Sequence, residues 1–245
     1  MYQPYIGTME TDPPGGKGTL VTSQTQATQF VNLAKQNKHI SMLHCSGDAA
    51  VDIGLQAYET NSKNSAYDSI KRIEHFGMFQ LTPQQLQRGK NLKLQHFHIS
   101  VQPIWLLELV NADYENMGAV RSKTGYQFKT MIKAGLEPAA STDMTGIYLG
   151  NINPFKAMYA LVTRQSDMGI FEPQEAITAK EALKMWTIWP AKAVGEEKVK
   201  GTIEVGKYAD MTVLSENLFA IPKEKIQDIA VKKTIVGGRV VYEAN

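Results

Sequence analysis

Short runs of β-prone residues alternate with stretches of helical spacing over the first two thirds of the chain. The β-prone runs are 39–47, 69–77, 96–103 and 136–143, and each ends in a Gly, a Pro or an Asp. The segments of helical spacing that follow them lie at 49–63, 82–92, 126–135 and 154–165. Because parallel strands need a crossover connection, which is usually a helix, four strand–helix units in series predict an α/β fold with a parallel sheet.

The two ends of the chain follow other patterns. Residues 2–22 are rich in Gly, Pro and Thr and predict a loop that leads into a further segment of helical spacing. Residues 177–195 predict another helix, in which Thr178 and Glu181 have the spacing of a capping box. Over 196–245, β-branched residues and Gly-containing turns replace the helical spacing, which predicts a small antiparallel sheet.

Composition and charge argue against several classes of partner. The chain is 43% hydrophobic with a formal net charge of +2, so there is no broad electrostatic reason to bind nucleic acid or an anionic membrane. The single cysteine, Cys45, cannot form an internal disulfide, and the first residues lack the pattern of a signal peptide. We therefore expect a cytoplasmic protein that acts on a small molecule.

Three residues with metal-binding side chains stand at the C-terminal ends of predicted strands. His44 and His75 lie near the ends of the first and second strands, and Asp143 ends the fourth. Because active sites of parallel sheets and barrels assemble at that end of the strands, we expect the three side chains to converge. Two imidazoles and a carboxylate suit zinc or a similar divalent ion. The competing interpretation is that each histidine is a hydrogen-bonded structural residue.

The remaining histidines have structural interpretations. His96 and His98 form an H-x-H, but they stand at the start of their strand, on the end opposite to His44 and His75. His39 also opens its strand. We therefore assign no metal ligand among these three residues.

Residues beside the two strand-end histidines also have roles to weigh. Asp48 is expected to cap the next helix, and the alternative is that it orients a metal ligand from the second shell. Arg72 and Glu74 are expected to form an ion pair without a catalytic role. Cys45 alternates away from His44 along the strand, so we expect it to pack against the helices as a small apolar residue.

The order of the short motifs resembles that of a known family. LHCSGDAAVDIGLQAYE, RIEHFG, ISVQP and STD are followed by KEALKMWTIWPAKAVG, GTIEVGKYADMTVL and VGGRVVY. This series resembles the C-terminal half of the amidohydrolase superfamily, and within it the YtcJ-like branch, which includes N-substituted formamide deformylases. The resemblance extends from about residue 20 to the end. Each motif is weak alone, but their order and spacing together are specific.

The resemblance implies a fold and a chemistry. Residues 1–195 would form part of a (β/α)8 TIM-type barrel, about strands five to eight with their helices, and residues 196–245 would form part of a composite β-sandwich. The implied enzyme is an amidohydrolase that cleaves C–N bonds of linear, non-peptide amides through a water activated by a divalent metal, most often zinc. His44 and His75 then correspond to the histidine ligands of strands five and six. Asp143 corresponds to the strand-eight ligand, which is also the catalytic base.

The chain departs from the family pattern in what precedes the first strand. The H-x-H of strand one, the strand-four ligand and the first sandwich strands have no counterpart before residue 39, and the usual G-S-D of strand eight is Ser141-Thr142-Asp143. Because four strand–helix units cannot close a barrel, we expect self-association or a complementing N-terminal half. The alternatives are an enzyme with its own three-ligand site, and a catalytically incompetent fragment or a binding or regulatory module that retains the fold.

Three further residues are candidates for substrate binding. Arg121, Trp105 and Tyr148 lie in the segments after the third and fourth predicted strands. The alternative for each is packing or a surface ion pair. The sequence does not define which amide is the substrate.

Overall fold

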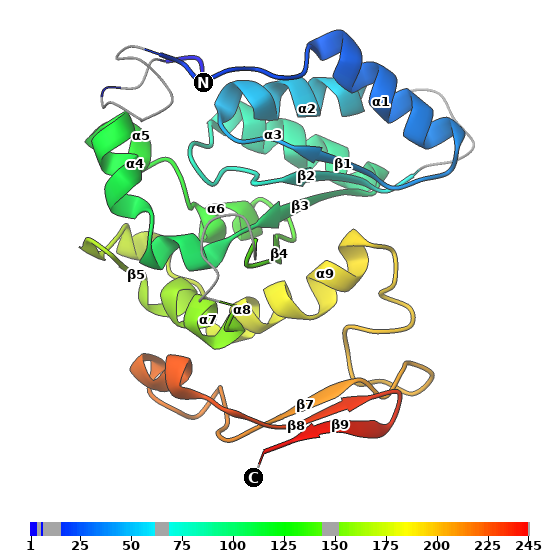
Figure 1. Ribbon diagram of the computed structural model, residues 1–245, viewed down its shortest axis with the longest axis vertical. Helices are drawn as coiled ribbons and strands as arrows, with labels where there is room; N and C mark the ends of the chain where they lie inside the picture. The colour runs from blue at the N-terminus through cyan, green and yellow to red at the C-terminus, as the bar shows by residue number, and fades with distance from the viewer. Residues whose placement is uncertain (4–5, 7–15, 62–68, 144–151, 245) are drawn as a thin grey trace.

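Four parallel strands form the main sheet of the protein (Figure 1). The computed structural model describes residues 1–3, 6, 16–61, 69–143 and 152–244. The strands are β1 (Ser41–His44), β2 (Lys71–Glu74), β3 (Phe97–Val101) and β4 (Ala139–Ala140), and they lie side by side in chain order. Ser41 pairs with Lys71, Lys71 with Phe97, and Ser100 with Ala139. The predicted parallel sheet is confirmed, and within the described residues β1 and β4 are its outer strands.

Helices α1 to α3 lie together on one side of this sheet (Figure 1). They are α1 (Gln24–Gln36), α2 (Asp48–Asn61) and α3 (Pro83–Leu92). α2 approaches the sheet closely at Gly54, where a Cβ would lie only 2.9 Å from Cys45 Sγ and 3.1 Å from Ile73 Cδ1. Cys45 is buried against the helix, as predicted, and burial raises the pKa of its thiol to about 12. This cysteine is therefore a packing residue and no thiolate nucleophile.

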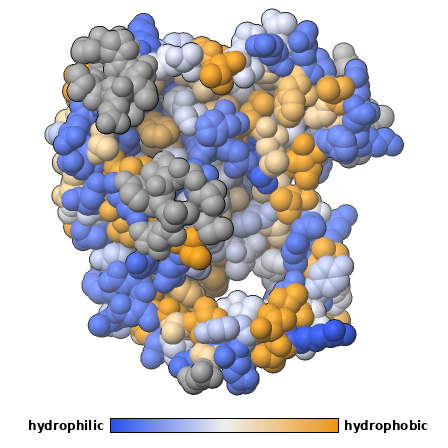
Figure 2. Space-filling model, in the orientation of Figure 1, coloured by the Kyte–Doolittle hydropathy of each residue, from blue (hydrophilic) through white to orange (hydrophobic). Residues whose placement is uncertain are grey.

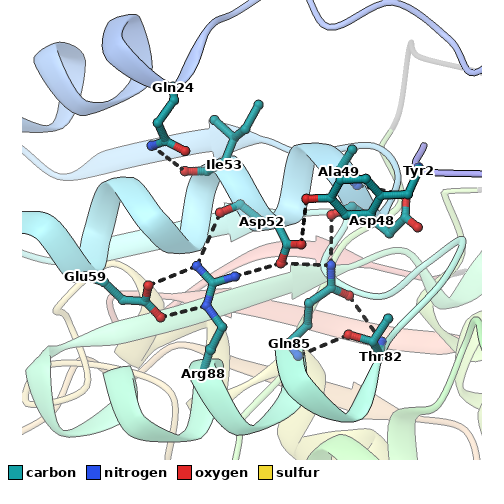
Figure 3. A network of polar contacts seen from close by, with 10 residues as sticks. All are labelled: Tyr2, Gln24, Asp48, Ala49, Asp52, Ile53, Glu59, Thr82, Gln85 and Arg88. Carbon is teal, nitrogen blue, oxygen red and sulfur yellow. Dashed lines mark hydrogen bonds and ion pairs between the residues drawn. The ribbon is translucent and has the colours of Figure 1, made fainter.

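A network of charged and amide groups joins α2 to α3 (Figure 3). The Arg88 guanidinium binds both carboxylate oxygens of Glu59, at 2.8 and 2.9 Å, and also donates to Asp52 at 2.7 Å. Gln85 donates to the backbone oxygen of Asp48 at 2.8 Å. The Tyr2 hydroxyl completes the network with a bond to Asp52 at 2.9 Å. These contacts hold α2, and with it the segment after β1, in a fixed position against α3.

The other helices between residues 93 and 193 follow α3 and β3 or cover the other side of the sheet. They are η1 (Lys93–Gln95), η2 (Pro103–Leu107), α4 (Val110–Met117), α5 (Ala119–Ser122), α6 (Phe128–Lys133), α7 (Pro154–Thr163), η3 (Pro173–Glu175), α8 (Ala179–Trp186) and α9 (Ile188–Ala193). A two-stranded hairpin, β5 (Gln165–Ser166) and β6 (Gly169–Ile170), follows α7. α8 and α9 contact the strands on the side opposite to α1 (Figure 1).

The single helix predicted over 177–195 is in fact two helices. The expected capping box is present, with Thr178 and Glu181 bonded reciprocally at the start of α8. The helix ends at Trp186, and Thr187 leaves the helical conformation with φ −129° and ψ −89°. The physical reason is Pro190, which has no N–H to donate and whose ring would clash with the carbonyl four residues earlier in a continuous helix.

The tail folds as the predicted antiparallel sheet. It consists of β7 (Met211–Leu214), η4 (Lys223–Asp228), β8 (Val231–Val236) and β9 (Arg239–Glu243), with β8 between the other two strands. It lies at the far end of the molecule from α1 (Figure 1). Every residue of β9 is exposed. Across the described part of the chain, no helix has both the length and the apolar character needed to cross a membrane.

A buried polar network ties α4 to the segment around α6 and α7. Arg164 is completely buried, and its guanidinium donates to the backbone oxygens of Phe171 at 3.0 Å and Tyr126 at 3.1 Å. The Tyr126 hydroxyl donates to a carboxylate oxygen of Asp113 at 2.7 Å. Burial raises the pKa of Asp113 to about 7, although the bond from Tyr126 acts in the opposite direction. The folded protein therefore holds this carboxyl protonated to a much higher pH than the unfolded chain does.

We predict that Asp113→Asn changes how stability depends on pH. Between the unfolded pKa of about 3.9 and the folded pKa of about 7, the native state of the parent protein binds the extra proton, so its stability falls as pH rises. Asparagine carries no charge and still accepts the bond from Tyr126. The variant should therefore lack this fall and should be more stable at about pH 8, by roughly 1.4 kcal/mol per unit of pKa difference at most.

Urea unfolding at about pH 5 and about pH 8 measures the effect. The exposed Asp228→Asn serves as the control, and its stability should change with pH as that of the parent does. Parallel pH profiles of the parent and Asp113→Asn would contradict a raised pKa at Asp113.

Candidate functional site

Two of the three predicted metal ligands lie together at the C-terminal edge of the sheet. His44 is the last residue of β1, and His75 directly follows β2, whose last residue pairs with His44. Nε2 of His75 lies 3.1 Å from Nδ1 of His44, and the two rings meet edge to face with centroids 4.5 Å apart. His75 has a left-handed backbone, with φ 62°, so the chain turns away from the strand at the residue that meets His44. The expected convergence of the two histidines is thus present.

A glutamine that sequence analysis did not single out orients His75. Gln102 directly follows β3, and its Oε1 lies 2.8 Å from Nδ1 of His75. The amide nitrogen of Gln102 donates to Oγ of Ser141, directly after β4, at 3.0 Å. With this orientation, Gln102 accepts the Nδ1 proton of His75, and Nε2 keeps its lone pair for the side that faces His44. The only signal in the sequence was the position of Gln102 at the end of its strand.

Trp105, predicted to contact substrate, stacks on the His75 ring. The two rings stack with centroids 5.2 Å apart and planes 12° from parallel. His75 is buried, and burial lowers its pKa below the usual value, although the bond to Gln102 acts in the opposite direction. The imidazole is therefore held neutral near neutral pH, which is the form that binds metals. His44, by contrast, is exposed.

Asp143 lies near the pair without joining it. It follows β4 by three positions, has a left-handed backbone with φ 52°, and its charge raises the pKa of His75 against the effect of burial. In the part of the chain that the structure describes, no three His, Cys, Asp or Glu side chains form a group that could hold a metal ion. The role of Asp143 as ligand and base thus stays a prediction.

Asp48 and Arg121 both bind backbone groups outside the histidine pair. Asp48 is the first residue of α2, and its Oδ1 accepts hydrogen bonds from the backbone N–H groups of Ala49 at 2.8 Å and Tyr2 at 3.0 Å. Its carboxylate therefore binds a backbone N–H of the first turn of α2, as expected for a residue at the start of a helix. Arg121 donates to the backbone oxygens of Met117 and Gln3. Tyr148 lies outside the described residues.

The residues predicted to have structural roles near the site, Arg72, Glu74, His96 and His98, lie as expected. Arg72 and Glu74 form the expected ion pair, at 2.5 Å. His98 lies near the start of β3, at the end of the sheet away from Gln102, and burial lowers its pKa to about 4. His96 precedes the strand with a left-handed backbone. Neither histidine belongs to the site at the C-terminal edge.

Comparison with known proteins decides the family. The model described as "Amidohydrolase family" matches residues 1–242. The chain belongs to the amidohydrolase family. Within it, the YtcJ-like relatives predicted from the motifs are confirmed.

Two relatives and one solved structure illustrate the likeness. N-substituted formamide deformylase of Arthrobacter pascens is 31% identical over 205 residues, which are 82% of this chain and 36% of that protein. YtcJ of Bacillus subtilis (strain 168), named as an amidohydrolase, is 26% identical over 237 residues, 95% of this chain and 43% of that one. The crystal structure of a metal-dependent hydrolase from Pyrococcus horikoshii OT3 matches with a TM-score of 0.74 and 26% identity, over 90% of this chain and 42% of that one. This amidohydrolase chain thus spans less than half the length of each.

We predict that Trp105→Ala raises the pKa of His75 toward its usual value. Burial is the main cause of the lowered pKa, and removal of the stacked indole admits water to the ring. NMR titration of the His75 ring, with circular dichroism to confirm the fold, measures the change. Phe219→Ala, a substitution of an exposed residue in the tail, should leave the pKa of His75 unaltered. A pKa above about 6.5 in the parent protein would show that burial does not govern His75.

Proposed function

We propose that this chain supplies part of the active site of a metal-dependent hydrolase that cleaves the C–N bond of linear, non-peptide amides. Its four-stranded sheet would be one part of a (β/α)8 barrel. The observation that carries the proposal is the pairing of His44 with His75 at the C-terminal edge of the sheet, 3.1 Å apart and oriented by Gln102. Membership of the amidohydrolase family and the likeness to a metal-dependent hydrolase support the reaction class.

The histidine pair fits a divalent metal such as zinc. Two nitrogens bound to one tetrahedral zinc at about 2.0–2.1 Å each lie about 3.3 Å apart, close to the observed separation. His75 has its lone pair on the correct nitrogen, because Nδ1 donates to Gln102. Metal-binding histidines almost always donate their other ring N–H to an oxygen acceptor, which fixes the ring as Gln102 does here. His44 and His75 would therefore hold the metal, with Asp143 as the proposed third ligand.

Each residue of the site would then have a defined task. The metal, when bound, supplies Lewis acidity and lowers the pKa of a nearby water. His75 remains neutral because Trp105 and the protein interior exclude water from its ring. Asp143 would accept a proton from the attacking water at a carboxylate oxygen and return it to the leaving nitrogen. The N-substituted formamides named for one relative are the substrates we would test first.

One observation supports a second candidate function. Among the described residues, no third ligand joins the histidine pair. This favours a chain that keeps the amidohydrolase fold as a binding or regulatory module and does not hydrolyse substrate alone. Zinc binding without hydrolysis, even when a second polypeptide supplies the rest of the proposed barrel, would select this candidate.

We predict that His75→Ala abolishes stoichiometric zinc binding and, with it, any hydrolysis of N-substituted formamides. Gln102→Ala should lower zinc affinity by about 10–100-fold, because the ring loses its orienting acceptor. Isothermal titration with zinc and measurement of formate release test the two effects separately.

His98→Ala is the matched control, since His98 is a half-buried histidine of the same sheet but lies at its opposite end. That variant should bind zinc as the parent does. Equal zinc affinity in the parent, His75→Ala and Gln102→Ala would rule out the proposed ligand pair.

A further inference from the structure

Two backbone hydrogen bonds fix the segment that follows His75. The N–H of Tyr126 donates to the backbone oxygen of Gly77 at 3.1 Å, and the N–H of Leu81 donates to that of Thr124 at 2.9 Å. Tyr126 and Thr124 both belong to the short connection between α5 and α6. This connection therefore holds the segment after His75 at two points.

The two segments pack against each other backbone to backbone. A Cβ placed on Gly125 would lie 2.6 Å from the backbone oxygen of Met78 and 2.9 Å from that of Phe79, so only glycine allows this approach. Tyr126 is 1% exposed. The contact therefore lies beneath the surface, one face of which has polar and apolar side chains interspersed (Figure 2).

Tyr126 has a left-handed backbone, with φ 55°, which is rare for a bulky residue. Three parts of the chain hold it in this conformation. Besides its bond to Gly77, its hydroxyl donates to Asp113 of α4 at 2.7 Å, and its backbone oxygen accepts from Arg164, directly after α7, at 3.1 Å. His75 is also left-handed, with φ 62°. Such conformations persist only where the surroundings over-determine them, and they cluster at functional sites.

The direction of the His75 ring depends on this contact. His75 stands between β2, which ends at Glu74, and the segment that Tyr126 holds. A shift of that segment changes φ and ψ of His75, and with them the direction of its ring. The segment also carries Phe79, whose ring centroid lies 5.8 Å from that of Trp105, the residue stacked on His75. The same shift would therefore disturb the stacking on the imidazole.

We propose that Tyr126 is a positioning residue of the histidine pair. Held by Asp113 through its hydroxyl, it fixes the segment after His75 and so keeps the His75 ring aligned with His44 and stacked on Trp105. It acts through the backbone of that segment and not through the metal. The consequence for zinc affinity rests on the function proposed above, whereas the alignment of the ring is a property of the protein without metal.

Tyr126→Phe removes only the hydroxyl and its bond to Asp113. In the full chain without zinc, the NMR signals of the His75 ring should shift, because the ring moves relative to the Trp105 indole. Zinc affinity, measured by isothermal titration, should fall by about threefold to tenfold. Asp113→Ala should have the same two effects. Asp113→Asn, which keeps an acceptor for the hydroxyl, should show the spectrum and the zinc affinity of the parent.

Tyr58→Phe is the matched control. Tyr58 is also completely buried, and its hydroxyl donates to the backbone oxygens of Ser41 at 3.0 Å and Arg72 at 2.9 Å, away from the segment after His75. This variant should lose stability in urea much as Tyr126→Phe does. Its His75 signals and its zinc affinity should nevertheless be those of the parent, which a merely structural role of Tyr126 would not explain.

The two readouts separate the failure of the positioning role from that of the metal role. Equal His75 signals in Tyr126→Phe and Tyr58→Phe would overturn the positioning role, whether or not the parent binds zinc. Shifted His75 signals in Tyr126→Phe, together with a parent that binds no zinc, would support the positioning role and refute the metal role alone.

Hydrogen exchange of the parent protein tests the proposal without any variant. The N–H of Met78 donates to the backbone oxygen of His75 at 3.2 Å and so reports on the turn that begins there. If Tyr126 holds this turn, the amides of Met78 and Tyr126 should open in one event, with the same dependence on urea. Independent opening of the two amides would overturn the proposal, even if Tyr126→Phe failed to fold.

Discussion

The candidate site depends on the parallel pairing of β1 to β4. Because the four strands run in one direction, the residues at their C-terminal ends lie along a single edge of the sheet. His44, His75, Gln102 and Ser141 occupy these four positions and form one row of hydrogen bonds across the edge. A single side chain at one strand end would have no neighbour to fix its orientation. The parallel register aligns the four side chains, so each fixes the orientation of the next.

Much of this arrangement could be predicted from the sequence, because the strand ends have clear signals. His44 and His75 stand near a glycine that closes a β-prone run, and a parallel sheet then requires them to be neighbours. Gln102 and Ser141 have the same positional signal, but amides and hydroxyls are common at strand ends and have no distinctive chemistry. The role of Gln102 and Ser141 becomes clear only from the distances that join Ser141 to Gln102 and Gln102 to His75 in the structure. Asp143 shows the converse, since the left-handed turn at this residue, which decides where its carboxylate lies, cannot be inferred from spacing.

Breaks in the regular elements were harder to predict than the elements themselves. The capping box at Thr178 correctly marked the start of α8. The pattern of apolar residues continued through Pro190 and suggested one helix, whereas the missing N–H and the ring of that proline divide it into two. A similar limit applies to the buried groups. Nothing in the sequence around Asp113 indicates that its carboxyl is enclosed with Tyr126, because that depends on packing between α4 and a segment after α5.

The two histidines differ in exposure because one lies on an outer strand and the other directly follows an inner strand. His75 lies on an inner strand, where Trp105 and the neighbouring strands exclude water from its ring. His44 lies on an outer strand and is exposed, because no described strand covers the far side of β1. In the proposed (β/α)8 barrel, the strand before β1 would pair with this outer strand and would shield His44 as Trp105 shields His75. Electrostatic interactions strengthen when water is excluded, so metal binding at the pair and closure of the proposed barrel should be coupled in free energy.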